Sequence, residues 1–471
     1  MSSKLMFRCF LLAFLFGFLG MLILGYKIFS SNDDHPVYYD NFLVDVNEDH
    51  RPLDEELDEE SIVSSIKEPI ILWWTPFTGE KGIYKTCGNV KCFFTVRRAY
   101  RNHPMTSVFV FYGTDFKVTD LPLPRSPKHE WALLHEESPK NNYLFSHPEI
   151  MTLFNYTSTF KRESSYPITT QYLVGIDWLE NTQYLIPTGQ KNKHQKELAP
   201  LMYAHSDCDV PSDRDHYVQM LQKYIKVDSY GTCLHNKDLP DHLKDPIQGM
   251  DHKDFYKLIA KYKFSLAMEN GVCDDYITEK VWRPLMVGSL PVVMGSPKIK
   301  ELLPSNHSAI IVDDFSSVKE LADYLKYLNE NDAEYEKYFK WKETGITNPY
   351  LKKLVEKREW GVDSEEHWSP ATINFIDGFE CHICNAVHQN LDKQQRGQAP
   401  FPHRVTNDHY GCPAPLKFDD SGKRTHNKET NRIWQWDWFY GGQLAKAVRS
   451  FIDQNMTFTS VDLKNKLKIV L

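Results

Sequence analysis

The sequence lacks an excess of positive charge. It has 55 Lys and Arg residues against 63 Asp and Glu, a formal net charge of −8, so it has no basic footprint of the kind that binds nucleic acid. Eight acidic residues lie within 48–60, where they indicate a solvated spacer, and the rest of the chain is close to neutral. The sequence also lacks an internal repeat, which excludes a solenoid. Its 471 residues, 41% of them hydrophobic, are enough for two or three domains with sizeable cores.

Charge is also absent from residues 9–26, CFLLAFLFGFLGMLILGY. This run approaches the length that a helix needs to cross the hydrocarbon core of a bilayer. Lys4 and Arg8 precede it, which favours a cytosolic N-terminus. No convincing small-x-small cleavage site is present, so we favour a membrane anchor over a cleaved signal peptide. We therefore expect a cytosolic tail (1–8), a transmembrane signal-anchor (9–26) and an acidic stem (27–67) of a single-pass type II membrane protein of the Golgi or endoplasmic reticulum.

Sequons and cysteines agree with a lumenal location for the remainder. Three N-x-S/T sequons occur, at Asn155, Asn306 and Asn455. Nine cysteines are present, and setting aside Cys9 in the apolar run leaves an even number, which suits disulfides. The eight are Cys87, Cys92, Cys208, Cys233, Cys273, Cys381, Cys384 and Cys412. The C-x-x-C at 381–384, with His382 and His388 nearby, is also compatible with a redox site or half of a zinc site.

Apolar runs alternate with helical patterns along most of the chain. Residues 69–77, 107–113 and 131–137 predict short buried strands in a first α/β domain, which we place at 68–195. Strands and helices alternate more regularly in a second domain at 196–390, which predicts a parallel, Rossmann-like sheet. A C-terminal extension (391–471) is polar up to WQWDWFY at 434–440, before a helical pattern. These aromatics predict either docking on the core or a recognition surface.

A carboxylate-rich loop, ENGVCDDYITEKVW at 269–282, follows a predicted strand. Ligands of open α/β sheets bind at the carboxyl ends of strands. We expect a helix to begin near Thr278, with Asp274 and Asp275 as capping groups. Its N-terminus suits a phosphate, Lys280 adds a positive charge, and Glu279 can accept hydrogen bonds from sugar hydroxyls. The pattern predicts a nucleotide-sugar site, although capping acids before a helix are common without one.

Residues 264–297, FSLAMENGVCDDYITEKVWRPLMVGSLPVVMGSP, closely resemble the donor-binding motif of the α-1,3-fucosyltransferases. WWTPF, EESP and the late C-x-x-C follow in the order of that family, so the resemblance covers roughly residues 69–390. The similarity is closest to the branch numbered ten and eleven, through LLHEESPKNN, FYGTDF and SDCDVPSDRDHYV. Within that branch, the ten-type members are the most similar, through DDYITEK and NKDLP. That branch is assigned O-fucosylation of Ser and Thr in small disulfide-bonded EMI domains.

The resemblance implies a GT-B-like fold, two Rossmann-like domains facing a cleft, with the acceptor side first. It implies inverting transfer from GDP-β-L-fucose without a metal or other cofactor, to a protein or glycan of the secretory pathway. By their match to the motifs, Glu137 is the general base and Arg214 contacts the diphosphate. The other matched donor contacts are Asn270, Tyr276, Glu279 and Lys280.

Several alternatives stay open at this point. Strand alternation puts Glu136 and Glu137 on opposite sides, and only the resemblance favours Glu137. The D-x-D pairs at 207–209 and 213–215 are typical of metal-dependent glycosyltransferases of another fold. Met268, Gly271, Lys140 and Asn141 depart from the common family pattern, which leaves the acceptor open between protein Ser/Thr and GlcNAc of glycans. A lumenal thiol oxidoreductase and a non-catalytic fucose- or glycan-binding protein are the alternatives of a different class.

The family also implies a disulfide arrangement. Two N-terminal cysteines of its members bond to the late C-x-x-C. In this chain that joins Cys87 and Cys92 to Cys381 and Cys384, in either of the two possible pairings. The pairing of the remaining four cysteines stays open.

Overall fold

The computed structural model describes residues 66–245, 249–362, 373–415, 417–425 and 433–468. The expected cytosolic tail, signal-anchor and nearly all of the acidic stem lie outside these residues. Within the described ranges, no helix is both long and apolar enough to cross a membrane.

Two sheets form the framework, the first mostly parallel and the second entirely parallel. The first has six strands in the order β2-β3-β1-β4-β5-β6, and β2 runs antiparallel to β3 while the other neighbours pair in parallel. The second has five strands in the order β11-β10-β9-β7-β8, all parallel. The predicted α/β class with parallel sheets is therefore confirmed.

The first sheet contains β1 (Ile70–Thr75), β2 (Ile83–Cys87), β3 (Val90–Thr95), β4 (Thr106–Tyr112), β5 (Glu130–His135) and β6 (Tyr156–Thr159). The second contains β7 (Leu201–Ala204), β8 (Val227–Tyr230), β9 (Phe264–Met268), β10 (Leu290–Met294) and β11 (Ile310–Ile311). A short antiparallel pair is formed by β12 (Lys417–Phe418) and β13 (Arg424–Thr425). The helices are α4 (Pro148–Met151), α5 (Ile176–Glu180), α6 (Thr188–His194), α7 (Arg214–Gln222), α8 (Lys253–Ala260), α9 (Glu279–Val287), α10 (Val318–Glu330), α11 (Asp332–Glu336), α12 (Lys340–Thr344), α13 (Pro349–Lys357), α14 (Phe375–Gln395), α15 (Ile433–Asp453) and α16 (Ser460–Lys468).

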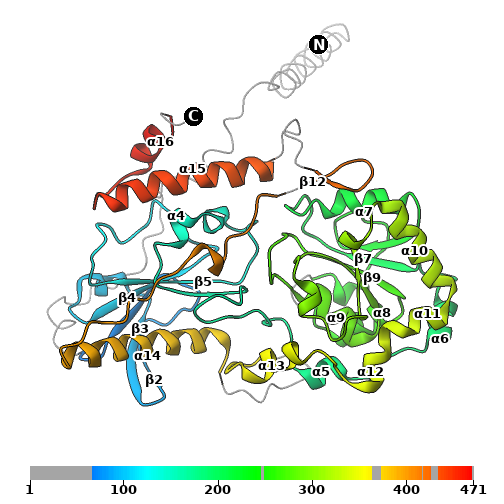
Figure 1. Cartoon of the computed structure of the whole chain (residues 1–471), viewed down its shortest axis with the longest axis horizontal. Helices are drawn as coiled ribbons and strands as arrows, with labels where there is room; N and C mark the ends of the chain where they lie inside the picture. The colour runs from blue at the N-terminus through cyan, green and yellow to red at the C-terminus, as the bar shows by residue number, and fades with distance from the viewer. Residues whose placement is uncertain (1–65, 246–248, 363–372, 416, 426–432, 469–471) are drawn as a thin grey trace, which may run out of the picture. The chain divides into compact units, whose positions relative to one another are not determined.

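Helix α14 covers one face of the first sheet (Figure 1). Its Phe379 and Ile383 are fully buried in one cluster with Trp73 and Val110 of the sheet. The helix lies mostly within the range expected for the second domain, yet it packs on the first sheet. The chain therefore returns to its first half after the second sheet is complete.

The second sheet has an apolar core on each face. Helices α8 and α9 pack in one core, and α7 and α10 pack in the other. Strand β9 illustrates the division, because Ala267 belongs to the first core and Leu266 and Met268 to the second. This two-sided burial explains why β9 is an uninterrupted buried run.

Helix α15 begins at Ile433, so the aromatic run 434–440 forms its first two turns, whereas the sequence predicted a helix only after it. The helix packs against α4. Trp438 donates a hydrogen bond through Nε1 to Cys412 O (3.4 Å), and Trp434 to Asp209 O (2.7 Å). Trp436 and Phe439 remain 43% and 44% exposed. Trp434 and Trp438 of this run therefore dock on the core, whereas Trp436 and Phe439 face outward.

Candidate functional site: a donor cavity beside a glutamate pair

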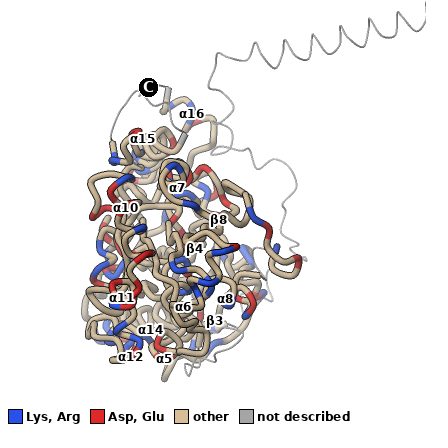
Figure 2. Tube along the Cα trace, turned by 90° about the vertical axis from the view of Figure 1, so that its right-hand side faces the viewer, with Lys and Arg blue, Asp and Glu red and all other residues tan. Residues whose placement is uncertain are grey.

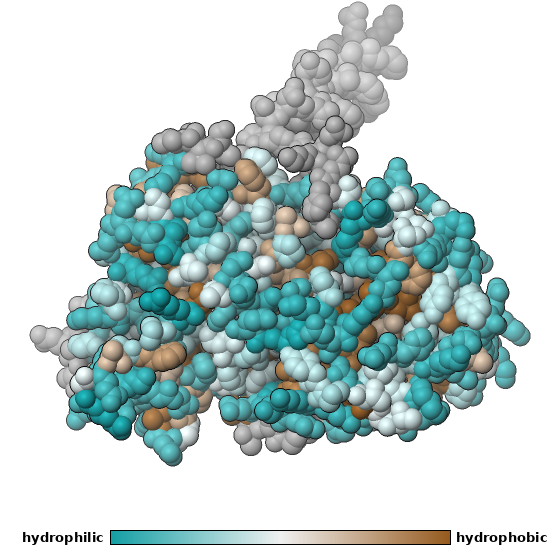
Figure 3. All heavy atoms as spheres, viewed as in Figure 1, coloured by the Kyte–Doolittle hydropathy of each residue, from teal (hydrophilic) through white to brown (hydrophobic). Residues whose placement is uncertain are grey.

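A cavity of about 290 Å³ opens at the carboxyl ends of β7, β8 and β9. Its apolar side includes Leu239, Leu243, Phe255, Ile259 and Leu266. Its polar side includes Arg214, Asn270, Glu279 and Lys280. Most of the surface in Figure 3 is hydrophilic, and apolar side chains come to the surface over the region of β9 and α8. The cavity thus has one side suited to a flat apolar ring and another suited to phosphates and hydroxyls.

Arg214 is the first residue of α7, and its guanidinium is almost fully buried. It donates from Nη1 to Met268 O (3.0 Å) and from Nη2 to Asp207 O (2.7 Å). Its Nε has no hydrogen-bond partner among the described residues. Two backbone carbonyls therefore fix the orientation of the guanidinium, while the Nε–H and the positive charge are left for a ligand.

Thr278 caps helix α9, and its Oγ1 accepts from Lys280 N. The prediction that Asp274 and Asp275 cap this helix is wrong. Asp275 has a left-handed backbone (φ 65°), and its carboxylate accepts from the backbone N (3.1 Å) and Nε (2.9 Å) of Arg162. The carboxylate therefore ties the loop to the first half of the chain instead of to its own helix.

Sequence reasoning did not single out Glu269, which organises this loop. Its buried carboxylate accepts from Thr278 N (2.7 Å) and Thr278 Oγ1 (2.9 Å). Burial raises the pKa of Glu269, while Lys280 opposes this effect. Its position directly after the predicted strand, within ENG, is the only signal that the sequence offers.

Glu279 and Lys280 form an ion pair at the start of α9. Lys280 Nζ lies 3.0 Å from Glu279 Oε1 and 3.1 Å from Thr278 Oγ1. Burial disfavours the charged form of Glu279, but Lys280 and Arg283 outweigh it and lower the pKa to about 2. Burial also disfavours the Lys280 cation, but Glu279 and Glu269 raise its pKa. Both side chains are therefore charged at neutral pH, a cation for phosphates and an acceptor for hydroxyls.

Asn270 and Tyr276 are the remaining two residues that the sequence predicted to contact the donor. Asn270 Oδ1 is buried without a hydrogen-bond partner among the described residues, as expected of an acceptor reserved for a ligand. Tyr276 is buried and donates to Glu137 Oε2 at 3.3 Å. The lining thus gathers four of the predicted residues. Tyr276 joins the carboxylate-rich loop at 269–282, which we call the donor loop, to Glu137 in the first half of the chain.

Glu136 and Glu137 follow β5 and have different surroundings. Glu136 Oε1 accepts from Tyr112 Oη at 2.8 Å, and its Oε2 is buried without a partner among the described residues. Burial raises the pKa of Glu136 to about 7, with Glu137 adding to the rise and Tyr112 opposing it. Glu137 points instead to Tyr276 of the donor loop. The structure therefore places Glu137, and not Glu136, against the donor half.

Three of the four acids in the two D-x-D pairs have protein partners for their carboxylates. Asp207 forms an ion pair with Lys140. Asp215 accepts from Tyr203 Oη (2.7 Å) and from Asp209 N (3.1 Å). Asp213 accepts from Phe418 N at 3.0 Å. These carboxylates serve the packing of the loop before α7.

The disulfides that the even cysteine count predicts are present. Cys87 bonds to Cys381, and Cys92 bonds to Cys384. The C-x-x-C is therefore not an internal dithiol, because its two cysteines on α14 reach separate strands, β2 and β3. This geometry argues against the oxidoreductase alternative.

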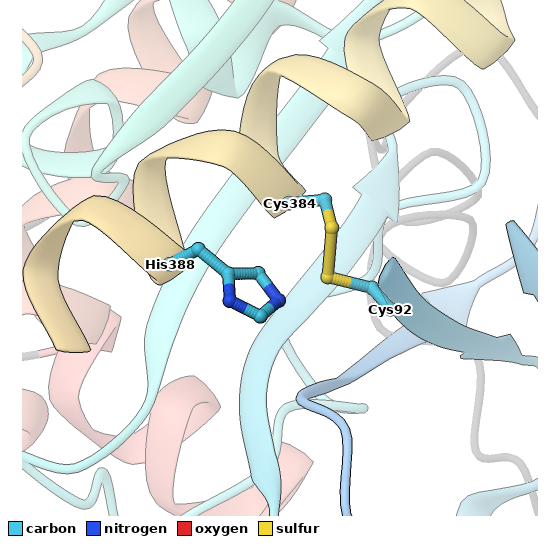
Figure 4. Close-up of side chains that lie close together, drawn as sticks. All are labelled: Cys92, Cys384 and His388. Carbon is cyan, nitrogen blue, oxygen red and sulfur yellow. A yellow bond between two sulfur atoms is a disulfide. The ribbon is translucent and has the colours of Figure 1, made fainter. Parts of the chain in front are cut away.

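Cys92, Cys384 and His388 have ligand atoms within 4.8 Å of one another. Figure 4 shows why this group does not make half of a zinc site: the two sulfurs are bonded to each other, which leaves no thiolate to bind a metal. His388 Nε2 is 2.9 Å from Lys91 O and holds the helix against the strand.

The four cysteines left open by the sequence pair around the donor cavity. Cys208 bonds to Cys233, and Cys273 bonds to Cys412. The first pair joins the segments that follow β7 and β8, where Asp207 and Gly231 line the cavity. The second joins the donor loop to the C-terminal extension.

The three sequons differ in accessibility. Asn306 and Asn455 are exposed. Asn155 is only partly exposed, its Oδ1 accepts from Trp131 N (3.0 Å), and its Nδ2 donates to His403 O (3.1 Å). Both side-chain atoms of Asn155 are thus already used inside the fold.

Charges of both signs are interspersed along the described trace (Figure 2). No broad face of one sign is visible in that view. This distribution agrees with the composition, which gave no sign of a nucleic-acid-binding surface.

Two family models match the chain. "Fucosyltransferase, N-terminal" matches residues 66–172, and "Glycosyltransferase family 10 (fucosyltransferase) C-term" matches residues 192–399. A solved alpha1,3-fucosyltransferase structure with GDP is 15% identical, covers 68% of this chain and 92% of its own, and gives a TM-score of 0.37.

Curated relatives are much more similar in sequence. The GDP-fucose protein O-fucosyltransferase 3 of Homo sapiens is 50% identical over 394 residues, which are 83% of this chain and 81% of that protein. The protein of the same name from Gallus gallus is 48% identical over 393 residues, 83% and 82% of the two chains. With identity at this level over most of both chains, and both family models placed on the two sheets that carry the site, the chain belongs to glycosyltransferase family 10, the fucosyltransferases.

Proposed function

We propose that this protein moves L-fucose from GDP-β-L-fucose to Ser or Thr hydroxyls of folded, disulfide-bonded protein domains. The transfer inverts the anomeric centre and uses no metal. The two sheets act as the acceptor and donor halves of a GT-B-like enzyme. The enzyme works in the lumen of the Golgi or endoplasmic reticulum, held to the membrane by the apolar run at 9–26.

The charge arrangement of the donor cavity carries the proposal. GDP leaves with negative charge on its diphosphate, and Arg214 and Lys280 are both positioned on the polar side of the cavity. Fixed positive groups in a partly closed site stabilise such developing charge without reorganising. The apolar side receives the guanine, and Glu279 and Asn270 Oδ1 accept hydrogen bonds from hydroxyls of the donor.

Glu137 supplies the base. An inverting transfer needs one carboxylate that removes the proton of the acceptor hydroxyl as its oxygen attacks C1 of the sugar. The sugar passes through a cation-like state, and GDP departs from the opposite face. Glu137 comes from the acceptor half and contacts Tyr276 of the donor loop, so it stands where the two substrates must meet.

The acceptor assignment draws on the relatives, which are named for protein O-fucosylation. Lys140 and Asn141 follow the proposed base, Glu137, by three and four residues. Lys140 pairs with Asp207 of the donor half, so its ammonium is held at a residue that lines the donor cavity. Transfer to GlcNAc of N-glycans is the second candidate, since the family motifs around the donor do not distinguish the two acceptors.

The test is a comparison of initial rates with labelled GDP-fucose and the full chain. Three acceptors are offered at equal concentration: a folded disulfide-bonded EMI domain, the same domain reduced and alkylated, and a free N-glycan. We expect label on Ser or Thr of the folded domain and little on the other two. Equal rates on the folded and reduced forms would contradict folded-surface recognition, and a faster rate on the glycan would favour the second candidate. Glu137→Gln serves as the inactive control.

A further inference from the structure

The C-terminal extension reaches the proposed base. The family models end at residue 399, so the segment that follows lies outside both matches. Within this segment Tyr410 is fully buried, and its hydroxyl donates to the backbone carbonyl of Glu137 at 3.0 Å. A side chain from outside the family models therefore holds the peptide unit that carries the base.

The ring of Tyr410 lies in an aromatic cluster that continues to the donor loop. Its centroid is 5.2 Å from that of His135, which directly precedes the two glutamates, and 5.1 Å from that of Phe160. Phe160 in turn packs on Tyr276 at 5.0 Å, edge to face. The ring of Tyr410 thus contacts the last residue of β5, two residues before the base. Through Phe160 it also supports Tyr276, which donates a hydrogen bond to the base carboxylate.

Two further contacts fix the segment on either side of Tyr410. Thr159 Oγ1 on β6 donates to His409 O at 2.6 Å. Cys412 is bonded to Cys273, which lies in the donor loop between Asn270 and Tyr276. The segment is therefore attached to the acceptor sheet before Tyr410 and to the donor loop after it.

We propose that Tyr410 is a positioning residue for Glu137, and that the Cys273–Cys412 disulfide holds Tyr410 in a fixed position relative to the donor loop. The inference rests on the proposed function, in which Glu137 is the base. The hydrogen bond fixes the plane of the Glu137 carbonyl and with it the direction in which the side chain leaves the backbone. Tyr410 does not touch the substrates, and its effect on transfer passes through Glu137.

Tyr410→Phe removes the hydroxyl and keeps the ring. We expect kcat for transfer to fall about 3- to 10-fold, the scale of one neutral hydrogen bond. KM for GDP-fucose and the Kd for GDP should stay within about twofold of wild type, since the ring packing and the donor cavity are intact. The matched control is Tyr143→Phe, another buried tyrosine of the acceptor half whose hydroxyl has no hydrogen-bond partner among the described residues. This control should leave kcat within about twofold.

A second variant tests the disulfide independently. Cys273→Ser with Cys412→Ser should lower kcat at least as much as Tyr410→Phe, and should also raise the Kd for GDP, because the freed loop carries Asn270. The positioning role would be overturned if kcat of Tyr410→Phe stayed within about twofold of wild type. It would also be overturned if Tyr143→Phe lowered kcat by the same factor. A double serine variant with unchanged kcat and Kd would overturn the role of the disulfide. Wild-type protein that transfers no fucose would overturn the proposed function and this inference together.

Discussion

Glu136 and Glu137 should respond differently when each carboxylate is replaced by an amide. Glu137→Gln removes the proposed base, and transfer should fall by roughly 10²- to 10⁴-fold, the usual scale for a positioned base. GDP binding should be unchanged, because Glu137 does not line the donor cavity. Glu136→Gln keeps an acceptor for Tyr112 Oη, so its transfer rate should change much less.

Glu136 should instead affect stability. Burial raises its pKa from 4.5 to about 7. Because the folded state holds the proton more tightly than the unfolded state, the contribution to stability is present below pH 4.5 and is lost as pH rises through 7. The full difference corresponds to roughly 3 kcal/mol. Glutamine cannot titrate, so Glu136→Gln should remove this part of the pH dependence.

The assay combines three measurements on wild type and both variants. Transfer rates and GDP affinity are measured at pH 7, and thermal midpoints are measured at pH 5 and pH 8. Wild type should lose more stability than Glu136→Gln between the two pH values. If Glu136→Gln loses transfer as severely as Glu137→Gln, the assignment of the base is wrong. If wild type and Glu136→Gln show the same pH dependence of the midpoint, Glu136 is not the buried acid that the structure indicates.

Three further outcomes are expected. Protein treated with a chelator should retain both GDP affinity and transfer, measured against untreated protein, and a strict Mn²⁺ requirement would contradict metal-free transfer. Lys280→Met should weaken GDP binding about 10- to 100-fold by calorimetry, the scale of one hydrogen bond to a charged group; the exposed Lys300→Met is the control and should bind normally. Mass spectrometry of the secreted or membrane-bound protein should find glycans on Asn306 and Asn455 and an unmodified Asn155, whose side-chain amide is already bonded inside the fold; an occupied Asn155 would show that this packing does not form as described.

Much of the donor half could be predicted from the sequence, because its strands are short apolar runs separated by helical patterns. The loop at 269–282 follows β9 as expected, and four predicted residues line one cavity. The capping groups could not be predicted. Several acids and Thr278 stand near the helix start, and only the folded chain shows that Asp275 is engaged by Arg162 and leaves the cap to Thr278.

Long-range packing was the other feature that the sequence could not predict. The pattern of residues 375–395 gives no sign that α14 returns to the first sheet, because that return depends on contacts with strands almost 300 residues earlier. The same holds for Cys273 and Cys412, whose sequence separation is 139. Family resemblance supplied the partners of Cys381 and Cys384, but it could not supply a bond to a segment beyond residue 399.

The relation between base and donor is set by links from several parts of the chain. The Asp275 carboxylate, fully buried, binds Arg162 of the first half, and Tyr276 beside it binds Glu137. Lys140, three residues after the base, pairs with Asp207 at the rim of the donor cavity. In each of these links, a residue that follows a strand of the first sheet contacts a loop of the second sheet. A buried charge that loses its partner is costly, so the Arg162–Asp275 pair disfavours separation of the halves, and the base is held at the donor loop before an acceptor arrives.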